Sequence, residues 1–406
     1  MKITIFAENS KNSTIMVDES LYAYMRLQLE LTTSDFHRYL YDDVNWSARM
    51  VAITGARGVG KSTMVLQYVK TQMADSKALY ISADHTYFST HTLVEVADEF
   101  SKEAGRLLVI DEVHKYPDWA RELKQIYDTH PDMRVIFTGS SVLDIIEGVA
   151  DLSRRVLHYT MYGLSFREYL GLFHHISTPT YSLEDILGGK AHIEGLLHPL
   201  PVFREYLSEG YYPFAIEGDF PMRMQNVITK TIESDIAQYA ELKASTAKKL
   251  KKMLAVISTL APYKPNADSL ATEIGISRNS VQDYLALLER AQLIGQLRDD
   301  TGGMRGLGKV EKVYIDNPSL MSVLSGGKTD VGNMRETFFY NQMRVKNDVI
   351  SSRLSDFVIG GCTFEVGGRN KGKRQIENVP DAYVVKDDIE FAQGNVIPLW
   401  AFGLNY

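Results

Sequence analysis

The sequence has one cysteine, no long apolar stretch and no overall excess of basic residues, and each deficit excludes a class of protein. Cys362 alone cannot form an intramolecular disulfide, a zinc finger or an iron–sulfur cluster. No segment approaches the roughly eighteen apolar residues of a membrane-spanning helix, and no cleavable leader follows the N-terminal residues MKITIFAENSKNSTIM. The 406 residues carry 44 Lys and Arg against 51 Asp and Glu, which excludes a wholly basic nucleic-acid coat but permits a local basic patch. The composition predicts a soluble, multidomain, cytoplasmic protein.

From Met50 to about Gly163, short β-rich segments alternate with segments of helical length. The β-rich segments read MVAIT, ALYIS, LLVI, RVIFT and RVLHYTMY. Strands that alternate with helices in this way predict an α/β fold, with a parallel sheet covered on both faces.

A glycine-rich motif lies between the first of these strands and the helix pattern STMVLQYVKTQM. Residues 55–62 read GARGVGKS and fit the phosphate-binding pattern G-x-x-x-x-G-K-[ST] without a mismatch. Glycines in such a loop let successive N–H groups point at phosphate oxygens, and the following helix adds a favourable dipole. Lys61 is expected to reach the β- and γ-phosphates and Ser62 to ligate magnesium. The motif therefore predicts a binding site for ATP and Mg²⁺ formed by Gly55, Ala56, Arg57, Gly58, Val59, Gly60, Lys61, Ser62 and Thr63.

Two acidic residues end a later apolar strand, in the segment RLLVIDEVHKYPDW. An acidic residue at the tip of a buried strand beside bound phosphate holds the magnesium shell, a role that we assign to Asp111. Glu112 is then placed to orient or deprotonate the attacking water. The segment predicts the catalytic acids of a nucleotide hydrolase.

Further candidates follow along the chain. The segment MRVIFTGSS (133–141) ends in small hydroxyl residues, and in P-loop ATPases with an inserted strand a polar residue at this point senses the γ-phosphate. Ser140 is the first candidate for this role and Thr138 the second, and the alternative is a plain turn from strand to loop.

Arg154 and Arg155 come next, and an arginine that reaches the γ-phosphate stabilises the transition state from its own subunit or a neighbour's. We name Arg155 as the candidate, with an ordinary surface arginine as the alternative.

With these elements in order, the chain resembles the predicted AAA-type ATPases of bacteria and archaea that carry a C-terminal domain of unknown function. The segments that carry the resemblance are YISAD, IDEVHKYPDWARELK, VIFTGSS, LSFREYL, ISRNSVQDYLALLERAQLI and KVYIDNPSL. One departure is Gly163, where the family usually has proline. The resemblance implies an ATP-binding core, a helical lid, a winged helix and a domain akin to PD-(D/E)XK nucleases. We expect an N-terminal helical leader (1–47), the core (48–165), the lid (166–240), the winged helix (241–312) and the nuclease-like domain (313–406).

The segment ADSLATEIGISRNSVQDYLALLERAQLI also has helix-turn-helix spacing of its own. Ala271 is expected to pack against the second helix, Gly275 to form the turn and Val281 to be buried. Base edges are normally contacted from the exposed start of the second helix, which carries Arg278, Asn279 and Gln282. Residues 241–310 hold eleven Lys or Arg against seven Asp or Glu, with the excess in KASTAKKLKK. Three roles stay open for the segment: sequence-specific DNA binding, looser contact with a phosphate backbone, or a protein-docking or lid element.

For the C-terminal domain, the resemblance implies carboxylates that bind magnesium and a Glu-x-Lys lysine that positions water. Glu336, Asp356 and Glu365 match the carboxylates in order and spacing, but Gly367 stands in the lysine position. A domain that is inactive or only binds substrate is therefore the default expectation. Lys371 and Lys373 could substitute for the lysine from the following loop, and Gln375 stands near the position of a helix glutamine in related nucleases. The basic run of Arg369, Lys371, Lys373 and Arg374 could hold a phosphate backbone or keep a loop soluble.

Three functions follow from these features. The first is an ATPase that hydrolyses Mg²⁺-ATP slowly without a partner and moves the lid and winged helix. The second is an ATP/ADP switch that controls docking of a protein or DNA partner, and the third is an ATP-regulated nuclease. The sequence leaves the oligomeric state open.

Overall fold

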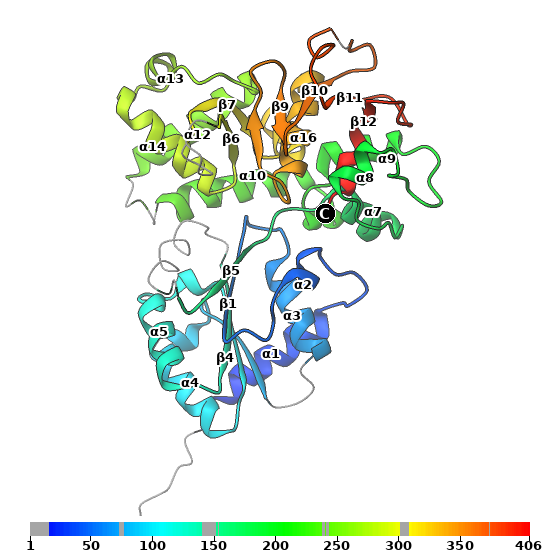
Figure 1. The fold of residues 1–406 in the computed structure, drawn as a ribbon. Coiled ribbons are helices and arrows are strands. Elements are labelled where there is room, and N and C mark those ends of the chain that lie inside the picture. Colours follow the sequence, from blue (N-terminus) through cyan, green and yellow to red (C-terminus); the bar gives the residue numbers. More distant parts are fainter. Residues whose placement is uncertain are drawn as a thin grey trace, which may run out of the picture.

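The computed structural model describes residues 16–72, 77–139, 152, 154–237, 240, 243–300, 308–372 and 374–406. Two lobes make up the chain (Figure 1). We call residues 16–163 the core lobe and residues 164–406 the cap lobe, in each case with the gaps given above. The core lobe contains the first sheet, and the cap lobe contains the other two.

The core lobe has alternating helices and strands, as the sequence predicts. Its sheet has the order β2-β3-β4-β1-β5, and every pair of neighbouring strands is parallel. Strand β4 thus lies between β1 and β3, which confirms the expected inserted strand. In chain order the elements are α1 (Glu19–Leu31), α2 (Leu40–Asp43), β1 (Met50–Thr54), α3 (Lys61–Gln72), β2 (Ala78–Ser82), η1 (Thr86–Ser89), α4 (Leu93–Lys102), β3 (Leu107–Asp111), η2 (Val113–Lys115), α5 (Trp119–Thr129), β4 (Arg134–Gly139) and β5 (Leu157–Thr160).

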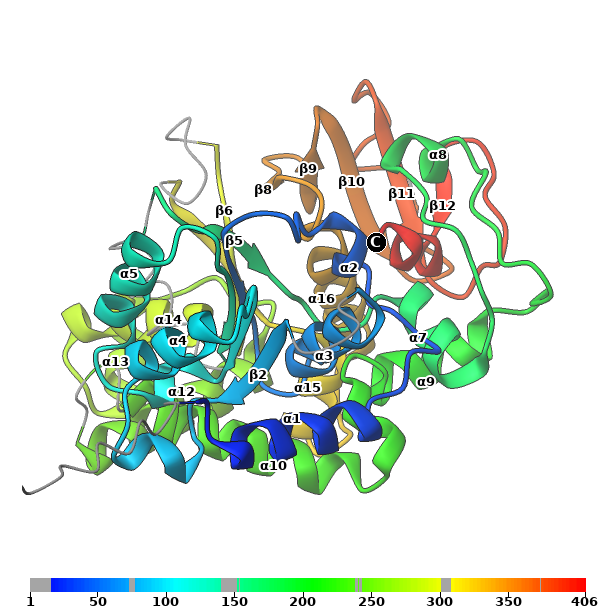
Figure 2. The same cartoon turned by 90° about the horizontal axis from the view of Figure 1, so that it is seen from below.

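Both faces of this sheet are covered, because successive strand residues point to opposite sides. Val51 and Ile53 pack with α3 in one hydrophobic cluster, whereas Met50 and Ala52 pack with α4 and α5 in another. Figure 2 shows α3 and α4 on opposite sides of β2. Residues 16–47 share these clusters through α1 and α2, so the N-terminal helices complete the core of the sheet rather than standing apart from it.

The cap lobe begins with helices and ends with a mixed sheet. Its elements are α7 (Phe166–His174), α8 (Leu183–Leu187), α9 (Leu200–Glu209), η3 (Pro213–Glu217), α10 (Phe220–Lys230), the π-helical η4 (Thr231–Ile236), α12 (Ala244–Leu260), α13 (Ala267–Ile274), α14 (Arg278–Arg290), β6 (Ile294–Arg298), β7 (Val310–Ile315), α15 (Pro318–Leu324), α16 (Val331–Met343), β8 (Val349–Ser351), β9 (Phe357–Ile359), β10 (Cys362–Gly367), β11 (Ala382–Lys386), β12 (Val396–Pro398) and η5 (Leu399–Leu404).

Three helices and a two-stranded antiparallel sheet follow one another in the middle of the cap lobe, from α12 to β7. Gly275 ends α13 in the left-handed conformation (φ +77°), which a residue without Cβ adopts without strain. Val281 on α14 is fully buried, as the spacing predicts. The three candidate base-contacting residues Arg278, Asn279 and Gln282 are exposed. The connection from β6 to β7 starts at Asp299, and its residues 301–307 lie outside the described part.

The last sheet has the order β12-β11-β10-β9-β8 and packs on α16. Its β10–β11 and β11–β12 pairs are parallel, whereas its β10–β9 and β9–β8 pairs are antiparallel. This sheet and α16 bring together the candidate carboxylates of the C-terminal segment.

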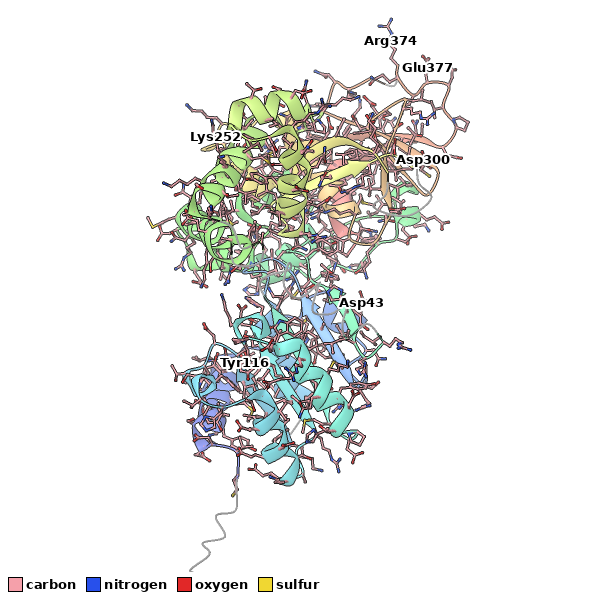
Figure 3. The ribbon with its side chains drawn as sticks, turned by 90° about the vertical axis from the view of Figure 1, so that its left-hand side faces the viewer. Asp43, Tyr116, Lys252, Asp300, Arg374 and Glu377 are labelled. Atoms are coloured by element: carbon pink, nitrogen blue, oxygen red, sulfur yellow. The ribbon has the colours of Figure 1, made fainter. Side chains whose placement is uncertain are left out.

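The two lobes touch at several points. Lys346 of the cap lobe pairs with Asp43, which Figure 3 places on the side of the core lobe that faces the cap. In the same view Arg374 and Glu377 lie at the end of the cap lobe far from the core lobe, and Lys252 and Asp300 lie on its sides. Of the helices that the structure describes, none combines the length and apolar character needed to cross a bilayer.

Candidate nucleotide-binding site

The GARGVGKS loop connects the end of β1 to the start of α3, at the edge of the sheet where the parallel strands end. Gly55, Gly58 and Gly60 have φ values of +151°, +79° and +96°, which L side chains rarely adopt. A Cβ on Gly55 would lie 2.2 Å from the Met161 carbonyl oxygen. The glycines are therefore required by the shape of the loop, and α3 directs its N-terminal N–H groups toward it.

Lys61 is buried beneath this loop. Its ammonium donates to the carbonyl oxygens of Gly55 (2.9 Å) and Ala56 (2.8 Å). Burial lowers the pKa of Lys61 to about 8. Because an ammonium has three N–H donors, one remains for a phosphate oxygen, whose negative charge would favour the charged form.

Asp111 is surrounded by hydroxyl groups. Ser62 Oγ donates to Asp111 Oδ1 (3.0 Å), Tyr80 OH donates to Oδ2 (2.8 Å), and Thr138 Oγ1 also contacts Oδ1. The carboxylate and the Ser62 hydroxyl are hard oxygen donors, which magnesium prefers. This donor set fits Mg²⁺ beside the loop.

Glu112 follows at the end of the strand in a left-handed conformation (φ +53°). A residue other than glycine keeps a left-handed backbone conformation where the surrounding structure enforces it. Its N–H donates to Thr138 Oγ1 (3.3 Å), and its carboxylate lies 3.6 Å from His114 Nε2 and 4.0 Å from Arg57 Nη1. Burial lowers the pKa of His114 to about 4, so this imidazole is neutral at pH 7. The Glu112 carboxylate is partly exposed and can meet water.

Arg38, between α1 and α2, hydrogen-bonds to the backbone of the loop and was not identified from the sequence. Its guanidinium donates to Glu168 Oε1 (2.8 Å), to the carbonyl oxygens of Tyr162 (2.8 Å) and Gly163 (2.9 Å), and to that of Val59 in the loop. The side chains of Arg38 and Glu168 are 5% and 0% exposed. No motif marks Arg38, because its partners are distant in sequence and three of its four acceptor groups are backbone carbonyls.

Three cap-lobe residues that were not identified from the sequence also contact the loop. Gln292 Oε1 accepts from the Ala56 N–H (2.8 Å), and Asp235 pairs with Arg57. The Phe214 ring lies against Gly58. Phe214 lies in η3, Asp235 in η4 and Gln292 in the turn between α14 and β6, so no sequence spacing could have grouped them.

The remaining candidates of the core lobe have different outcomes. Ser140 lies outside the described residues. The hydroxyl of Thr138, the second candidate, is bound to Asp111, which suits a role in positioning the acids. Thr63 is exposed in the first turn of α3.

Arg155 is not brought to the loop. It binds Asp128 (3.0 and 3.1 Å) and lies over the Tyr127 ring, both near the C-terminal end of α5. Helix α5 starts where β3 ends and finishes before β4 begins, so its C-terminal end lies at the opposite edge of the sheet. Arg155 therefore does not reach a phosphate at the loop of its own chain in this structure, and the adjacent Arg154 is exposed.

The carboxylates of the C-terminal segment are paired with lysines. Lys312 Nζ lies between Glu336 Oε2 (2.9 Å) and Asp356 Oδ1 (3.1 Å). Burial and the nearby Asp356 raise the pKa of Glu336. Among the described residues, no three His, Cys, Asp or Glu side chains are arranged to hold a metal ion.

The Lys371 side chain lies against Gly367 and contacts Glu365. A Cβ on Gly367 would lie 2.6 Å from Lys371 Cγ, so a side chain at position 367 would displace this lysine. The Gln375 amide faces the same carboxylate. Lys373 lies outside the described residues. A lysine from the following loop thus occupies the region where the missing lysine was expected.

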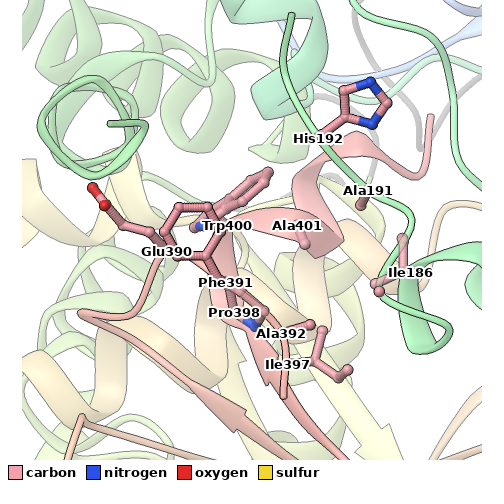
Figure 4. Close-up of a pocket in the computed structure, with 11 residues that line it drawn as sticks. Ile186, Ala191, His192, Glu390, Phe391, Ala392, Ile397, Pro398, Trp400 and Ala401 are labelled. Carbon is pink, nitrogen blue, oxygen red and sulfur yellow. The ribbon is translucent and has the colours of Figure 1, made fainter. Parts of the chain in front are cut away.

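A pocket of about 210 Å³ lies elsewhere in the cap lobe, between η5 and the segment around α8 (Figure 4). Phe391, Pro398 and Trp400 contribute apolar surface to it, and Glu390 and His192 contribute polar groups. None of the residues predicted from the sequence to form a functional site lines it.

Comparison with known proteins gives two family matches. Residues 47–170 match a family described as an AAA domain, and residues 200–331 match a domain of unknown function. The second match includes Phe214, Asp235 and Gln292, the three cap residues that contact the loop.

Individual proteins match as well. An uncharacterized protein of Methanocaldococcus jannaschii is 26% identical over 290 residues, which is 66% of this chain and 60% of that protein's length. Among solved structures, C. elegans PCH-2 has 14% identity and a TM-score of 0.25, over 67% of this chain and 70% of the other. NtrX from Brucella abortus in complex with ATP has 15% identity and a TM-score of 0.27, over 67% of each chain. The AAA-domain match is the finding that bears on the site, because it contains the whole loop, Asp111 and Glu112.

Proposed function

We propose that the protein binds Mg²⁺-ATP at residues 55–63 and hydrolyses it. The observation that carries this proposal is the convergence of three groups: Lys61 beneath the glycine loop, Ser62 bonded to Asp111, and Glu112 beside them. The match of residues 47–170 to the AAA domain supports it.

In this proposal each residue has a separate task. The loop N–H groups and Lys61 bind the β- and γ-phosphates, and Ser62 and Asp111 hold magnesium, which neutralises phosphate charge. Tyr80 and Thr138 hold Asp111 through its carboxylate oxygens. Glu112 accepts the proton of the attacking water. Hydrolysis then moves the lid (166–240) and the winged helix (241–312) relative to the core.

The test is ATP turnover by the purified chain, with Lys61→Ala as the comparison. We expect slow turnover by the wild type and at least about 100-fold weaker ATP binding by Lys61→Ala, because the buried ammonium is lost. Equal binding of ATP by the two proteins would contradict the proposed site.

The second candidate is an ATP/ADP switch that docks on DNA or a protein. The exposed start of α14 favours DNA: Arg278, Asn279 and Gln282 are exposed, as in a winged helix. On α12, Lys251 pairs with Glu233 and Lys252 with the Glu273 carbonyl oxygen, which leaves Lys248 and Lys249 for phosphate contact. In the same assay, double-stranded DNA that raises turnover at low salt and loses its effect at moderate salt would support DNA docking. Absence of stimulation favours a protein partner.

For the C-terminal segment we propose a nuclease-like fold without cleavage activity. Lys312 places a cation between Glu336 and Asp356, where a metal would have to compete with it. We expect no nicking of supercoiled plasmid in Mg²⁺ or Mn²⁺. Nicking by the wild type that disappears in Glu365→Ala would instead show that the domain is a nuclease that uses Glu365.

A further inference from the structure

The side chain of Arg57 leaves the loop and enters the cap lobe. Its Nε and Nη2 bind Asp235 Oδ2 and Oδ1 at 2.7 and 2.8 Å, a two-point contact that matches guanidinium to carboxylate geometry. Asp235 lies in η4 and its side chain is 3% exposed, and the side chain of Arg57 is 14% exposed. The pair is therefore poorly screened by solvent, and its charges act strongly on their neighbours.

The same guanidinium faces the proposed reaction centre. Arg57 Nη1 lies 4.0 Å from Glu112 Oε2, and Glu112 is the residue proposed to activate water for attack on the γ-phosphorus. Arg57 is therefore on the γ-phosphate side of the loop. A γ-phosphate adds negative charge at this point that ADP does not supply.

Two other contacts hold cap elements to the neighbouring loop residues. Gln292, at φ +56°, accepts from the Ala56 N–H at 2.8 Å. A Cβ on Gly58 would lie 2.6 Å from the Phe214 ring, so ring and loop backbone are in close contact. Loop residues 56, 57 and 58 thus contact three separate segments of the cap lobe. Movement of the Arg57 side chain would therefore change all three contacts.

We propose that Arg57 senses the γ-phosphate by exchanging Asp235 for phosphate oxygens, and so reports ATP, rather than ADP, to residues 213–292 of the cap lobe. This inference rests on the proposed function, because it needs ATP at the loop. Asp235 competes with the γ-phosphate for Arg57, and by reciprocity ATP weakens the attachment of η4 to the loop. Asp235 is a positioning residue in this scheme, since it acts through Arg57.

The experiment measures the Kd of fluorescent ATP and ADP for the wild type, Asp235→Asn and Asp43→Asn. Asp235→Asn removes the competing charge, so we expect ATP to bind about tenfold tighter and ADP less than about threefold tighter. Asp43→Asn breaks the exposed Lys346 contact, another ion pair between the lobes that lies away from the loop, and should change neither value. Asp235→Ser, which also removes the competing charge, serves as a second variant if Asp235→Asn does not fold, and should tighten ATP in the same direction.

Hydrogen exchange supplies a readout that does not depend on activity. In the wild type, ATP but not ADP should raise exchange in η4, whereas in Asp235→Asn exchange should already be high and respond little to ATP. Equal tightening of ATP and ADP, no tightening, or the same effect from Asp43→Asn would overturn the inference. If the wild type binds no ATP while its fold is intact, the proposed function itself fails, which separates the two outcomes.

Discussion

Glu112→Gln is expected to lower kcat for ATP hydrolysis by at least about 100-fold while the Kd for ATP changes little. The amide has the size of the carboxylate but cannot accept the proton of the attacking water. The contacts that would bind the nucleotide, from Lys61 and the loop N–H groups, remain in place. Single-turnover hydrolysis and equilibrium binding of ATP, measured on the same preparation, separate the two effects.

Glu19→Gln is the matched control for this experiment. Glu19 lies on α1, its side chain is 79% exposed, and it pairs with Arg26 away from the loop. Its substitution should leave kcat unchanged. A Glu112→Gln protein that hydrolyses ATP as fast as the Glu19→Gln protein would remove Glu112 from the role of general base.

Arg38→Met is expected to lower the free energy of unfolding by about 3–5 kcal/mol. The substitution leaves Glu168 as a buried carboxylate without its cation, and it removes the donor from the carbonyl oxygens of Val59, Tyr162 and Gly163. Because Val59 belongs to the loop, ATP binding should weaken as well. Urea denaturation followed by circular dichroism measures the first effect.

Arg26→Met provides the comparison for stability. Arg26 also pairs with a glutamate, but both side chains are mostly exposed, so its loss should cost less than about 0.5 kcal/mol. A similar small cost for Arg38→Met would mean that the Arg38–Glu168 pair contributes little net stability. Glu168→Gln, which leaves a neutral partner for Arg38, should destabilise less than Arg38→Met.

The parts of the fold that were predicted correctly depend on neighbouring residues. The glycine loop, the β-rich segments and the inserted strand β4 follow from apolar runs and turn residues within short windows. The α13–turn–α14 segment was predictable for the same reason, since Gly275 and Val281 stand at characteristic offsets.

The candidate site was predictable only where its residues lie in one motif or end a strand of the same sheet. Lys61 and Ser62 share the loop, and Asp111 follows from the rule that parallel strands end at a common edge. Arg155 shows the limit of this reasoning: its place after β4 suggested the γ-phosphate, but the ion pair with Asp128 holds it at the other edge.

The amino-acid sequence by itself therefore determined the phosphate-binding loop, the two acids Asp111 and Glu112 at the end of β3 and the alternation that forms the sheet, because each is encoded over a few adjacent residues. The tertiary structure alone decided that Arg38 supports the loop, that Asp235 binds Arg57, and that Lys312 joins Glu336 to Asp356. These partners are separated by 130, 178 and 24 positions. A charged side chain binds whichever opposite charge the packing of distant elements brings within reach, and no local pattern records that choice.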